Sequence, residues 1–292
     1  MLASKLKTDS LLFHLSFITF HLSFNPVWYW TKILFLIFLG AIGLWLIYEL
    51  VTFPNISALR TENPVTTSMI EYRLSEARTE GREQRKFMIW TPIEQISPNL
   101  QRAVLAGEDT RFFEHNGFDW EAIQNAWDEA MKEGEREARE ECEANANTKQ
   151  EKQDCAPSED DWIPPMPSFK RGASTITQQL AKNLYLSEDR NFLRKAREAV
   201  YTYFLERSLS KKRILELYLN VIEWGDGVYG AEAASRRYFN KSASNLTREE
   251  AAFLAAMIPS PLNVFNPIKN RKRVNRRQRV LLRNMNYVKL PY

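Results

Sequence analysis

An uncharged apolar run near the N-terminus restricts this chain more than any other feature of its sequence. Residues Ile33–Tyr48 contain no charged side chain, and together with Val27–Thr31 and Lys32 they reach the length of a membrane-spanning helix. Aromatic residues lie towards both ends, as at membrane–water interfaces: Trp28, Tyr29, Trp30, Trp45 and Tyr48. The sequence therefore predicts one transmembrane helix over residues 27–50, followed by a body, residues 51–292, that is large enough for one sizeable domain.

Charged residues around this run indicate its orientation. Three lysines precede its apolar core and one glutamate follows it: Lys5, Lys7, Lys32 and Glu49. The positive-inside rule then places the N-terminal segment, residues 1–26, in the cytoplasm and the body outside. A cleaved signal peptide is the weaker alternative, because no small-residue cleavage pattern follows the run. Leu11–Phe24 is apolar but short, which favours an interfacial segment or an upstream extension.

Acidic residues are concentrated in one part of the body. Residues 128–161 carry 13 acidic and 5 basic side chains, so the rest of the chain is strongly positive although the net charge is only +4. A positive body suits nucleic acid, an anionic membrane surface or a phosphorylated lipid. We expect residues 128–158 to be a flexible insertion without a catalytic role, because they are too polar to build a core. Its Cys142 and Cys155 either form a disulfide or stay unpaired.

Helical periodicity dominates the body. Thr67–Trp90 alternates apolar and charged residues and indicates a short strand or an ordered arm. After Ser97, apolar residues recur at helical spacing, and this helix is expected to end near Glu108. Further amphipathic helices are expected at 175–186, 192–209, 211–220, 230–238, 247–257 and 271–285. The sequence predicts a mainly α-helical domain.

The first chemically notable motif, EDTRFFEHNGFD, starts at Glu108, where a hydrophobic helix ends in an aromatic turn. Such surroundings can raise the pKa of a carboxyl group towards the range of a general base. Spacing alone favours a plainer interpretation, a salt-bridge cluster of Glu108, Arg111 and His115.

The second motif is GASTITQQLAKN, residues 172–183. Thr175 and Gln178 fit a capping box at a helix start. Gln178 and Lys182 are four residues apart, as are Gln179 and Asn183, so two polar pairs lie along one helix. Amides and an ammonium beside a helix N-terminus suit an anion or a sugar. A merely solvated polar face is the alternative.

The third motif places Arg190, Arg194 and Glu198 at four-residue steps on one helix face. These residues form either an ion-pair ladder of little energetic weight or a pyrophosphate cradle with a second carboxylate.

Taken in order, these stretches resemble a known family. EDTRFFEHNGFD, GASTITQQLAKN, RKAREAVYTYFLE and KKRILELYLNVIEWGDGVYG are similar to the motifs of the peptidoglycan glycosyltransferases, and the likeness continues in EEAAFLAAMIPSPLNVFNP and RRQRVLLRNM. The arm LRTENPVTTSMIEYR resembles that of the monofunctional biosynthetic transglycosylases. The resemblance covers roughly Phe53 to the end. The insertion 128–158 and Arg171, where many relatives carry glycine, depart from the pattern.

The resemblance implies a lysozyme-like helical fold with a small, membrane-apposed jaw lobe. It implies that lipid II is polymerised into glycan strands with inversion at the donor anomeric carbon and release of undecaprenyl pyrophosphate. Glu108 would be the general base and Glu198 the second catalytic carboxylate. Lys182 and Arg190 would bind the phosphates of the substrate. The other substrate-binding residues would be Ser174, Gln178, Gln179, Asn183, Arg194 and His115.

The expected partners and location follow from the same resemblance. The partners are lipid II, the growing glycan strand, the inner membrane and other cell-wall synthesis or division proteins, with no nucleic acid. The catalytic domain would be periplasmic on a single-pass inner-membrane anchor. Mg²⁺ or another divalent cation is a candidate cofactor with unknown ligands, and no organic cofactor is expected.

Two other functions fit parts of the sequence. A glycan hydrolase also needs an acidic residue in an aromatic setting, but it forms no pyrophosphate and has no use for Lys182, Arg190 and Arg194. A non-enzymatic membrane scaffold would use the basic helix Lys269–Arg283 to bind anionic lipid, a helix that we interpret as structural and membrane-facing.

Overall fold

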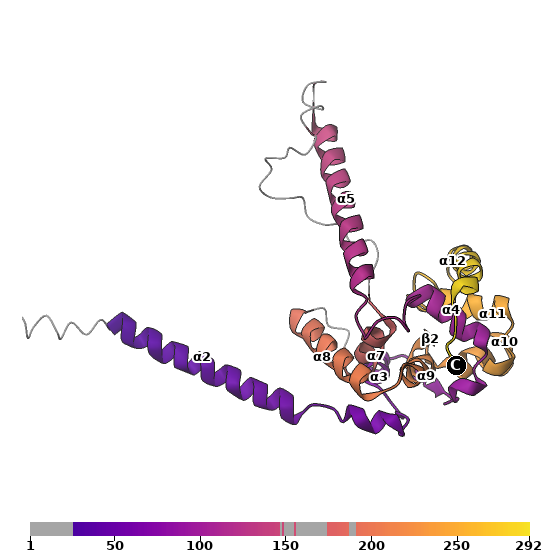
Figure 1. Cartoon of the computed structure of the whole chain (residues 1–292), viewed down its shortest axis with the longest axis horizontal. Coiled ribbons are helices and arrows are strands. Elements are labelled where there is room, and N and C mark those ends of the chain that lie inside the picture. Colours follow the sequence, from indigo (N-terminus) through magenta and orange to yellow (C-terminus); the bar gives the residue numbers. More distant parts are fainter. Residues whose placement is uncertain (1–25, 147, 149–154, 156–173, 187–190) are drawn as a thin grey trace, which may run out of the picture. The chain divides into compact units, whose positions relative to one another are not determined.

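The computed structural model describes residues 26–146, 148, 155, 174–186 and 191–292 (Figure 1). It divides into two units, Met1–Pro54 and Asn55–Tyr292. In the first unit, helix α2 (Pro26–Val51) contains the predicted apolar run, and nearly all its described side chains are exposed. By its length and apolar composition this helix is a candidate membrane span. The expectation for Leu11–Phe24 lies outside the described residues.

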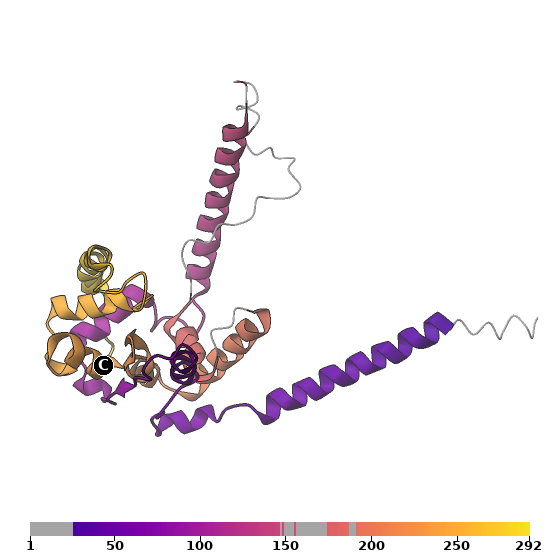
Figure 2. The same cartoon turned by 180° about the vertical axis from the view of Figure 1, so that it is seen from behind.

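The second unit is built mainly from helices, so the predicted mainly α fold is confirmed (Figures 1 and 2). The α-helices in its described part are α3 (Ser68–Thr79), α4 (Pro98–Glu108), α5 (Trp120–Asn145), α7 (Ile176–Tyr185), α8 (Phe192–Ser208), α9 (Lys211–Val221), α10 (Ala231–Phe239), α11 (Arg248–Met257) and α12 (Arg271–Asn284). Short 3₁₀ turns are η1 (Ile56–Arg60), η2 (Ile93–Gln95), η3 (Ala243–Asn245) and η4 (Met285–Tyr287). The helices predicted from periodicity lie within one or two residues of these bounds.

Two groups of helices enclose the core. Helix α11 is buried along residues 251–257 and packs against α4 and α12. Helix α7 packs against α3, α8 and α9. A capping box of Thr247 and Glu250 begins α11, and the predicted box of Thr175 and Gln178 begins α7. Helices α4 and α7 are therefore held by neighbours on more than one side.

A small sheet completes the unit. Strand β3 (Val228–Tyr229) lies between β1 (Phe87–Met88), which is parallel to it, and β2 (Glu223–Gly225), which is antiparallel. The turn before β3 requires glycine at position 227, where φ is +67° and a Cβ would lie 2.4 Å from Cβ of Arg85.

The strand alternative for Thr67–Trp90 was wrong for most of that segment. Residues Ser68–Thr79 form α3, and only Phe87–Met88 is a strand within it. The Thr67 hydroxyl accepts a hydrogen bond from the backbone N–H of Ile70 and so caps the helix. The buried residues of this helix are Met69, Ile70 and Ala77, which follow helical spacing and not alternation.

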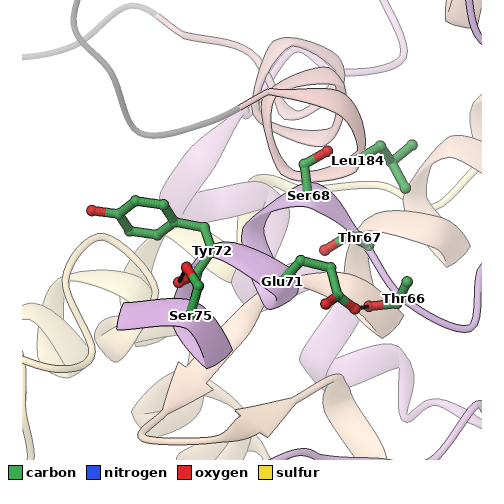
Figure 3. Close-up of a pocket in the computed structure, with 7 residues that line it drawn as sticks. All are labelled: Thr66, Thr67, Ser68, Glu71, Tyr72, Ser75 and Leu184. Atoms are coloured by element: carbon green, nitrogen blue, oxygen red, sulfur yellow. Dashed lines mark hydrogen bonds between the residues drawn. The ribbon is translucent and has the colours of Figure 1, made fainter. Parts of the chain in front are cut away.

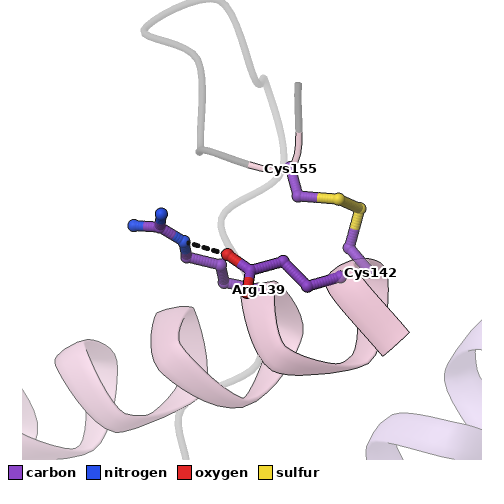
Figure 4. The surroundings of a disulfide bond; sticks show 4 residues. Arg139, Cys142 and Cys155 are labelled. Carbon is purple, nitrogen blue, oxygen red and sulfur yellow. Dashed lines mark hydrogen bonds and ion pairs between the residues drawn. A yellow bond between two sulfur atoms is a disulfide. The ribbon is translucent and has the colours of Figure 1, made fainter. Parts of the chain in front are cut away.

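The acidic insertion is helical in its first part. Helix α5 runs through residues 128–145, and its charged side chains pair along the helix, as Arg139 does with Glu143 (2.7 Å, Figure 4). Cys142 and Cys155 form a disulfide, which decides the alternative that the sequence left open. The rest of the segment lies mostly outside the described residues, so its flexibility stays a prediction.

Candidate active site

Glu108 is the last residue of α4, at the point where the chain leaves the core. Ser97 caps the start of this helix and Pro98 occupies its first position, where a missing N–H costs nothing. Leu100, Ala103, Val104 and Leu105 anchor the helix in the core. The side chain of Glu108 is consequently only 8% exposed, although it belongs to a charged residue type.

Two groups from distant parts of the chain hold the Glu108 carboxylate. Nη2 of Arg277, on α12, lies 2.9 Å from Oε1 and also donates to the carbonyl oxygen of Gly107 at 3.0 Å. Nε2 of Gln179, on α7, donates to Oε2 at 3.1 Å. The predicted cluster of Glu108, Arg111 and His115 was wrong, because Arg111 pairs with Glu114 and Glu121 instead.

These contacts act on the pKa of Glu108 in opposite directions. Burial raises the pKa and is the largest influence, whereas the positive charge of Arg277 and the hydrogen bonds from Gln179 and Arg277 lower it. The neighbouring charge of Asp109 also raises it, and the net pKa lies above the usual value for glutamate. A carboxylate with such a pKa is a stronger base than an exposed one, which suits proton abstraction.

A hydrogen-bonded frame holds the loop after Glu108 against the start of α7. Asp109 accepts from Nε2 of His115 at 3.0 Å and from the backbone N–H of Ile176 at 3.0 Å. Nδ1 of His115 accepts from the N–H of Gly117 at 3.2 Å, so the ring proton lies on Nε2. The Thr175 hydroxyl donates to the Gly117 carbonyl at 2.7 Å. His115 thus lies in the frame, and its assignment to substrate binding stays a prediction.

Gly117 in this loop packs directly against α8. Its φ is +88°, and a Cβ there would lie 2.8 Å from Cγ2 of Thr202 and 2.9 Å from Cγ of Glu206. A side chain at position 117 would therefore strain the backbone and push α8 away from the loop. The glycine of the HNG sequence keeps the first and third motifs in contact.

Asp109, His115 and Asp119 lie close enough together to be considered as metal ligands, since one ligand atom of each lies within 4.8 Å of the others. Their polar atoms already accept or donate hydrogen bonds: Asp109 binds His115, and Asp119 accepts from the N–H of Ala122 at 2.9 Å at the start of α5. We therefore assign this cluster to the frame and not to a cation site.

Glu198 occupies a second polar cluster on α8. Its side chain is 4% exposed, and it forms ion pairs with Nη1 of Arg194 at 2.8 Å and with Lys195. The predicted spacing of Arg194 and Glu198 on one face is confirmed, whereas Arg190 lies outside the described residues. The described part of the ladder therefore brings two cations to one buried carboxylate.

Some of the predicted polar residues of α7 stabilise the helix itself, and one contacts Glu108. The side chain of Gln178 closes the capping box by accepting from the N–H of Thr175 at 2.9 Å, and Asn183 donates to the carbonyl of Gln179 at 2.7 Å. Lys182 is half-buried on this helix, and Ser174, just before it, is exposed. Among these residues, Gln179 is the one that contacts Glu108.

Sequence reasoning missed two members of this site, Arg277 and Tyr218. Arg277 was treated only as one charge of a basic helix, yet it lies three residues after Val274 and four before Leu281, both buried. That spacing puts it on the inner face of α12 and was the available signal. The hydroxyl of Tyr218, on α9, donates a hydrogen bond to Oε1 of Gln179 at 2.7 Å, and no local sequence pattern predicts this contact.

A groove of about 700 Å³ lies elsewhere, over α3 (Figure 3). It is lined by residues around α3 and by one residue of α7: Thr66, Thr67, Ser68, Glu71, Tyr72, Ser75 and Leu184. The Glu71 carboxylate in this lining accepts a hydrogen bond from Thr66 at 2.5 Å. None of the predicted site residues that the structure describes lines this open groove, which therefore lies apart from the cluster around Glu108.

A transglycosylase family model matches residues 74–138 and 166–286 of the chain, which together are more than half of it. The chain belongs to the transglycosylase family. The match contains Glu108, Gln179, Glu198, Tyr218 and Arg277. Residues 139–165 stay unmatched, an interval that overlaps the predicted insertion 128–158 but begins later along α5.

Curated relatives agree with this family. A biosynthetic peptidoglycan transglycosylase of Chromobacterium violaceum is 39% identical over 89% of this chain and all of its own length. The protein of the same name from Thiobacillus denitrificans is 44% identical over 76% of this chain and 82% of its own length. The protein of the same name from Neisseria gonorrhoeae is 38% identical over 86% of this chain and 93% of its own length. The family predicted from the motifs is therefore confirmed.

Proposed function

We propose that this transglycosylase polymerises lipid II into peptidoglycan glycan strands, with Glu108 as the general base. The observation that carries the proposal is the buried Glu108 carboxylate held between Arg277 and Gln179 at the end of α4. The named relatives supply the substrate class, since each is called a peptidoglycan transglycosylase.

The proposed reaction is a displacement at the donor anomeric carbon. The 4-hydroxyl oxygen of the acceptor sugar forms the new bond, and the bond from the anomeric carbon to the pyrophosphate oxygen breaks. The electron pair leaves with undecaprenyl pyrophosphate, the hydroxyl proton passes to Glu108, and the anomeric configuration inverts. A base whose pKa is raised by burial removes that proton more readily than an exposed glutamate does.

The departing pyrophosphate gains negative charge, which fixed cations stabilise. We assign this role to Lys182 and Arg190, with Arg194 beside the second carboxylate Glu198. Ser174, Gln178, Gln179 and Asn183 are assigned to sugar binding and to the shape of the site. A divalent cation is the further candidate for neutralising the phosphates, and it would have to use ligands other than the engaged frame of Asp109 and His115.

Lys182→Ala is expected to weaken both lipid II binding and turnover, the latter by roughly 10²-fold. Lys182 lies three residues after Gln179 on α7, so it shares the helix side that contacts Glu108. Phosphates are present in the bound donor and gain charge as the bond breaks, which is why both quantities should fall. Substrate affinity and single-turnover rate are measured for Lys182→Ala and for Lys212→Ala, a control on α9 that pairs with Glu94. Unchanged affinity in Lys182→Ala would contradict the assignment.

We propose that the catalytic unit works at the outer surface of the inner membrane. The candidate membrane helix α2 supports anchoring, and α8 supports lipid contact because it exposes large apolar side chains. These are Phe192, Leu193, Val200, Tyr203 and Phe204, with Phe192 87% exposed. Partners among cell-wall synthesis or division proteins would be reached from this position.

The proposed orientation predicts that residues 49–292 are accessible from the periplasm. The positive-inside rule places the lysine-bearing N-terminal segment in the cytoplasm. Protease added to intact spheroplasts should therefore degrade the body, while a cytoplasmic marker protein stays intact. Full protection of the body under these conditions would reverse the topology.

Labelled lipid II incubated with the full-length chain in detergent tests the proposed function. Long glycan strands that depend on Glu108 support it. Shortening of added glycan polymer, without polymerisation, would instead make the protein a hydrolase.

A further inference from the structure

Tyr218 is connected to Glu108 through the side chain of Gln179. The tyrosine is fully buried on α9, and its Oη donates to Oε1 of Gln179 at 2.7 Å. Nε2 of the same amide donates to Oε2 of Glu108 at 3.1 Å. Two successive hydrogen bonds thus link a buried phenol on one helix to a buried carboxylate on another.

The amide of Gln179 has a donor end and an acceptor end, so its orientation matters. In the observed orientation the donor faces the carboxylate. If the amide rotated by half a turn, Oε1 would face the negative oxygen of Glu108 and the two would repel each other. The nearby Ser174 carbonyl, 3.4 Å from Nε2, is too distant to hold the amide firmly.

The Tyr218 hydroxyl selects between these two orientations. Burial, together with the charges of Glu108 and Asp109, raises the pKa of Tyr218 well above its ordinary value of 10. The phenol therefore keeps its proton and donates it in the hydrogen bond to Oε1 of Gln179.

We propose that Tyr218 is a positioning residue of the transglycosylase reaction, whose hydroxyl holds the Gln179 amide with its donor directed at Glu108. The carboxylate is thereby kept ionised and in place as the base. The inference rests on the proposed function and deepens it, because it assigns a role to a residue that does not itself touch the reacting atoms.

The expected effect on activity follows from the groups that face Glu108. These are Arg277 from α12, Gln179 from α7, Tyr218 from α9 behind that amide, and the neighbouring Asp109. The Gln179 hydrogen bond lowers the pKa of Glu108, so losing it raises that pKa. A base must be deprotonated to work, and the acidic limb of the pH–rate profile should therefore move to higher pH.

The test uses the full-length chain in detergent with labelled lipid II, and it compares single-turnover rates across pH for wild type and Tyr218→Phe. On the acidic limb the variant should be roughly tenfold slower, as expected for a weakened hydrogen bond to a charged group. At higher pH, where Glu108 is ionised in both proteins, the rates should converge. Tyr238→Phe is the matched control, because its partly buried hydroxyl donates to the Trp224 carbonyl at 3.0 Å, outside this network.

A double-mutant cycle isolates the path through Gln179. Gln179→Ala should shift the acidic limb in the same direction, and adding Tyr218→Phe to it should produce no further shift. Gln179→Glu, which keeps an acceptor for Tyr218 but turns a carboxylate towards Glu108, should shift the limb still further. A Tyr218→Phe effect that persists in the Gln179→Ala chain, or a rate loss that is equal at every pH, would overturn the inference.

The outcomes also separate this inference from the proposed function. A wild-type chain that forms no glycan, or an acidic limb that survives in Glu108→Gln, would reject the function itself. A wild-type chain with a Glu108-dependent limb, beside a Tyr218→Phe profile equal to that of the wild type, would reject the inference alone.

Discussion

Glu108→Gln is expected to slow glycan polymerisation by roughly 10²–10⁴-fold, the usual contribution of a general base. Glutamine preserves the size of the side chain and can still accept a hydrogen bond from Arg277, but it cannot take up the acceptor proton. Lipid II binding should change little, because the phosphate contacts are assigned to Lys182 and Arg190. The measurements are the single-turnover rate at saturating substrate and the affinity for lipid II in the same detergent.

A matched control for this substitution lies in the same motif. Glu114 is exposed and pairs with Arg111 at 3.2 Å, so Glu114→Gln removes a charge six residues away without touching the buried carboxylate. Its turnover should stay close to wild type. Near-normal turnover in Glu108→Gln would show that Glu108 is not the base, and the buried Glu198 would then become the leading candidate.

Features that depend on neighbours in sequence could be predicted in advance. The capping box of Thr175 and Gln178 was read from a three-residue spacing, and the structure contains both of its hydrogen bonds. The end of α4 at Glu108 followed from apolar periodicity and was also correct. Such signals are local, because a helix start or a buried helix face is specified within a few residues.

The partners of Glu108 could not be read in this way. Spacing favoured Arg111 and His115, which are near in sequence, whereas the observed partner Arg277 is 169 positions away. Packing of α12 and α4 on α11 brings the arginine to the carboxylate, and no local pattern encodes that packing. The family resemblance supplied Glu108 as the base, but not the groups that control its charge.

Tertiary packing that no local pattern encodes also explains why α3 was not predicted as a helix. Alternating apolar residues fit a strand and a half-buried helix about equally well over a short segment. The choice is made by the Thr67 cap and by burial of Met69, Ile70 and Ala77 in the folded unit. Tertiary packing decided an element that local alternation left ambiguous.

Arg277→Met is expected to reduce turnover near neutral pH by roughly 10²-fold, comparable to the loss of an electrostatic contact in a water-poor site. Arg277 supplies the largest influence that lowers the pKa of Glu108, so its removal lets burial raise that pKa further. The base is active only when deprotonated, and a higher pKa leaves less of it ionised at a given pH. The loss should therefore be greatest in acid and should diminish as the pH rises. Methionine keeps much of the length and apolar volume of the side chain that packs near Phe265.

Arg279→Met provides the control, because Arg279 is exposed on the same helix and its substitution removes the same charge from α12. Any effect that comes from the overall basic character of α12, including attraction to anionic lipid, should appear equally in both variants. The pH-dependent loss should appear only in Arg277→Met, and it should vanish when Arg277→Met is combined with Glu108→Gln, since no carboxylate then remains to titrate. Identical pH–rate profiles for Arg277→Met and Arg279→Met would mean that Arg277 serves the charge of the helix and not the ionisation of Glu108.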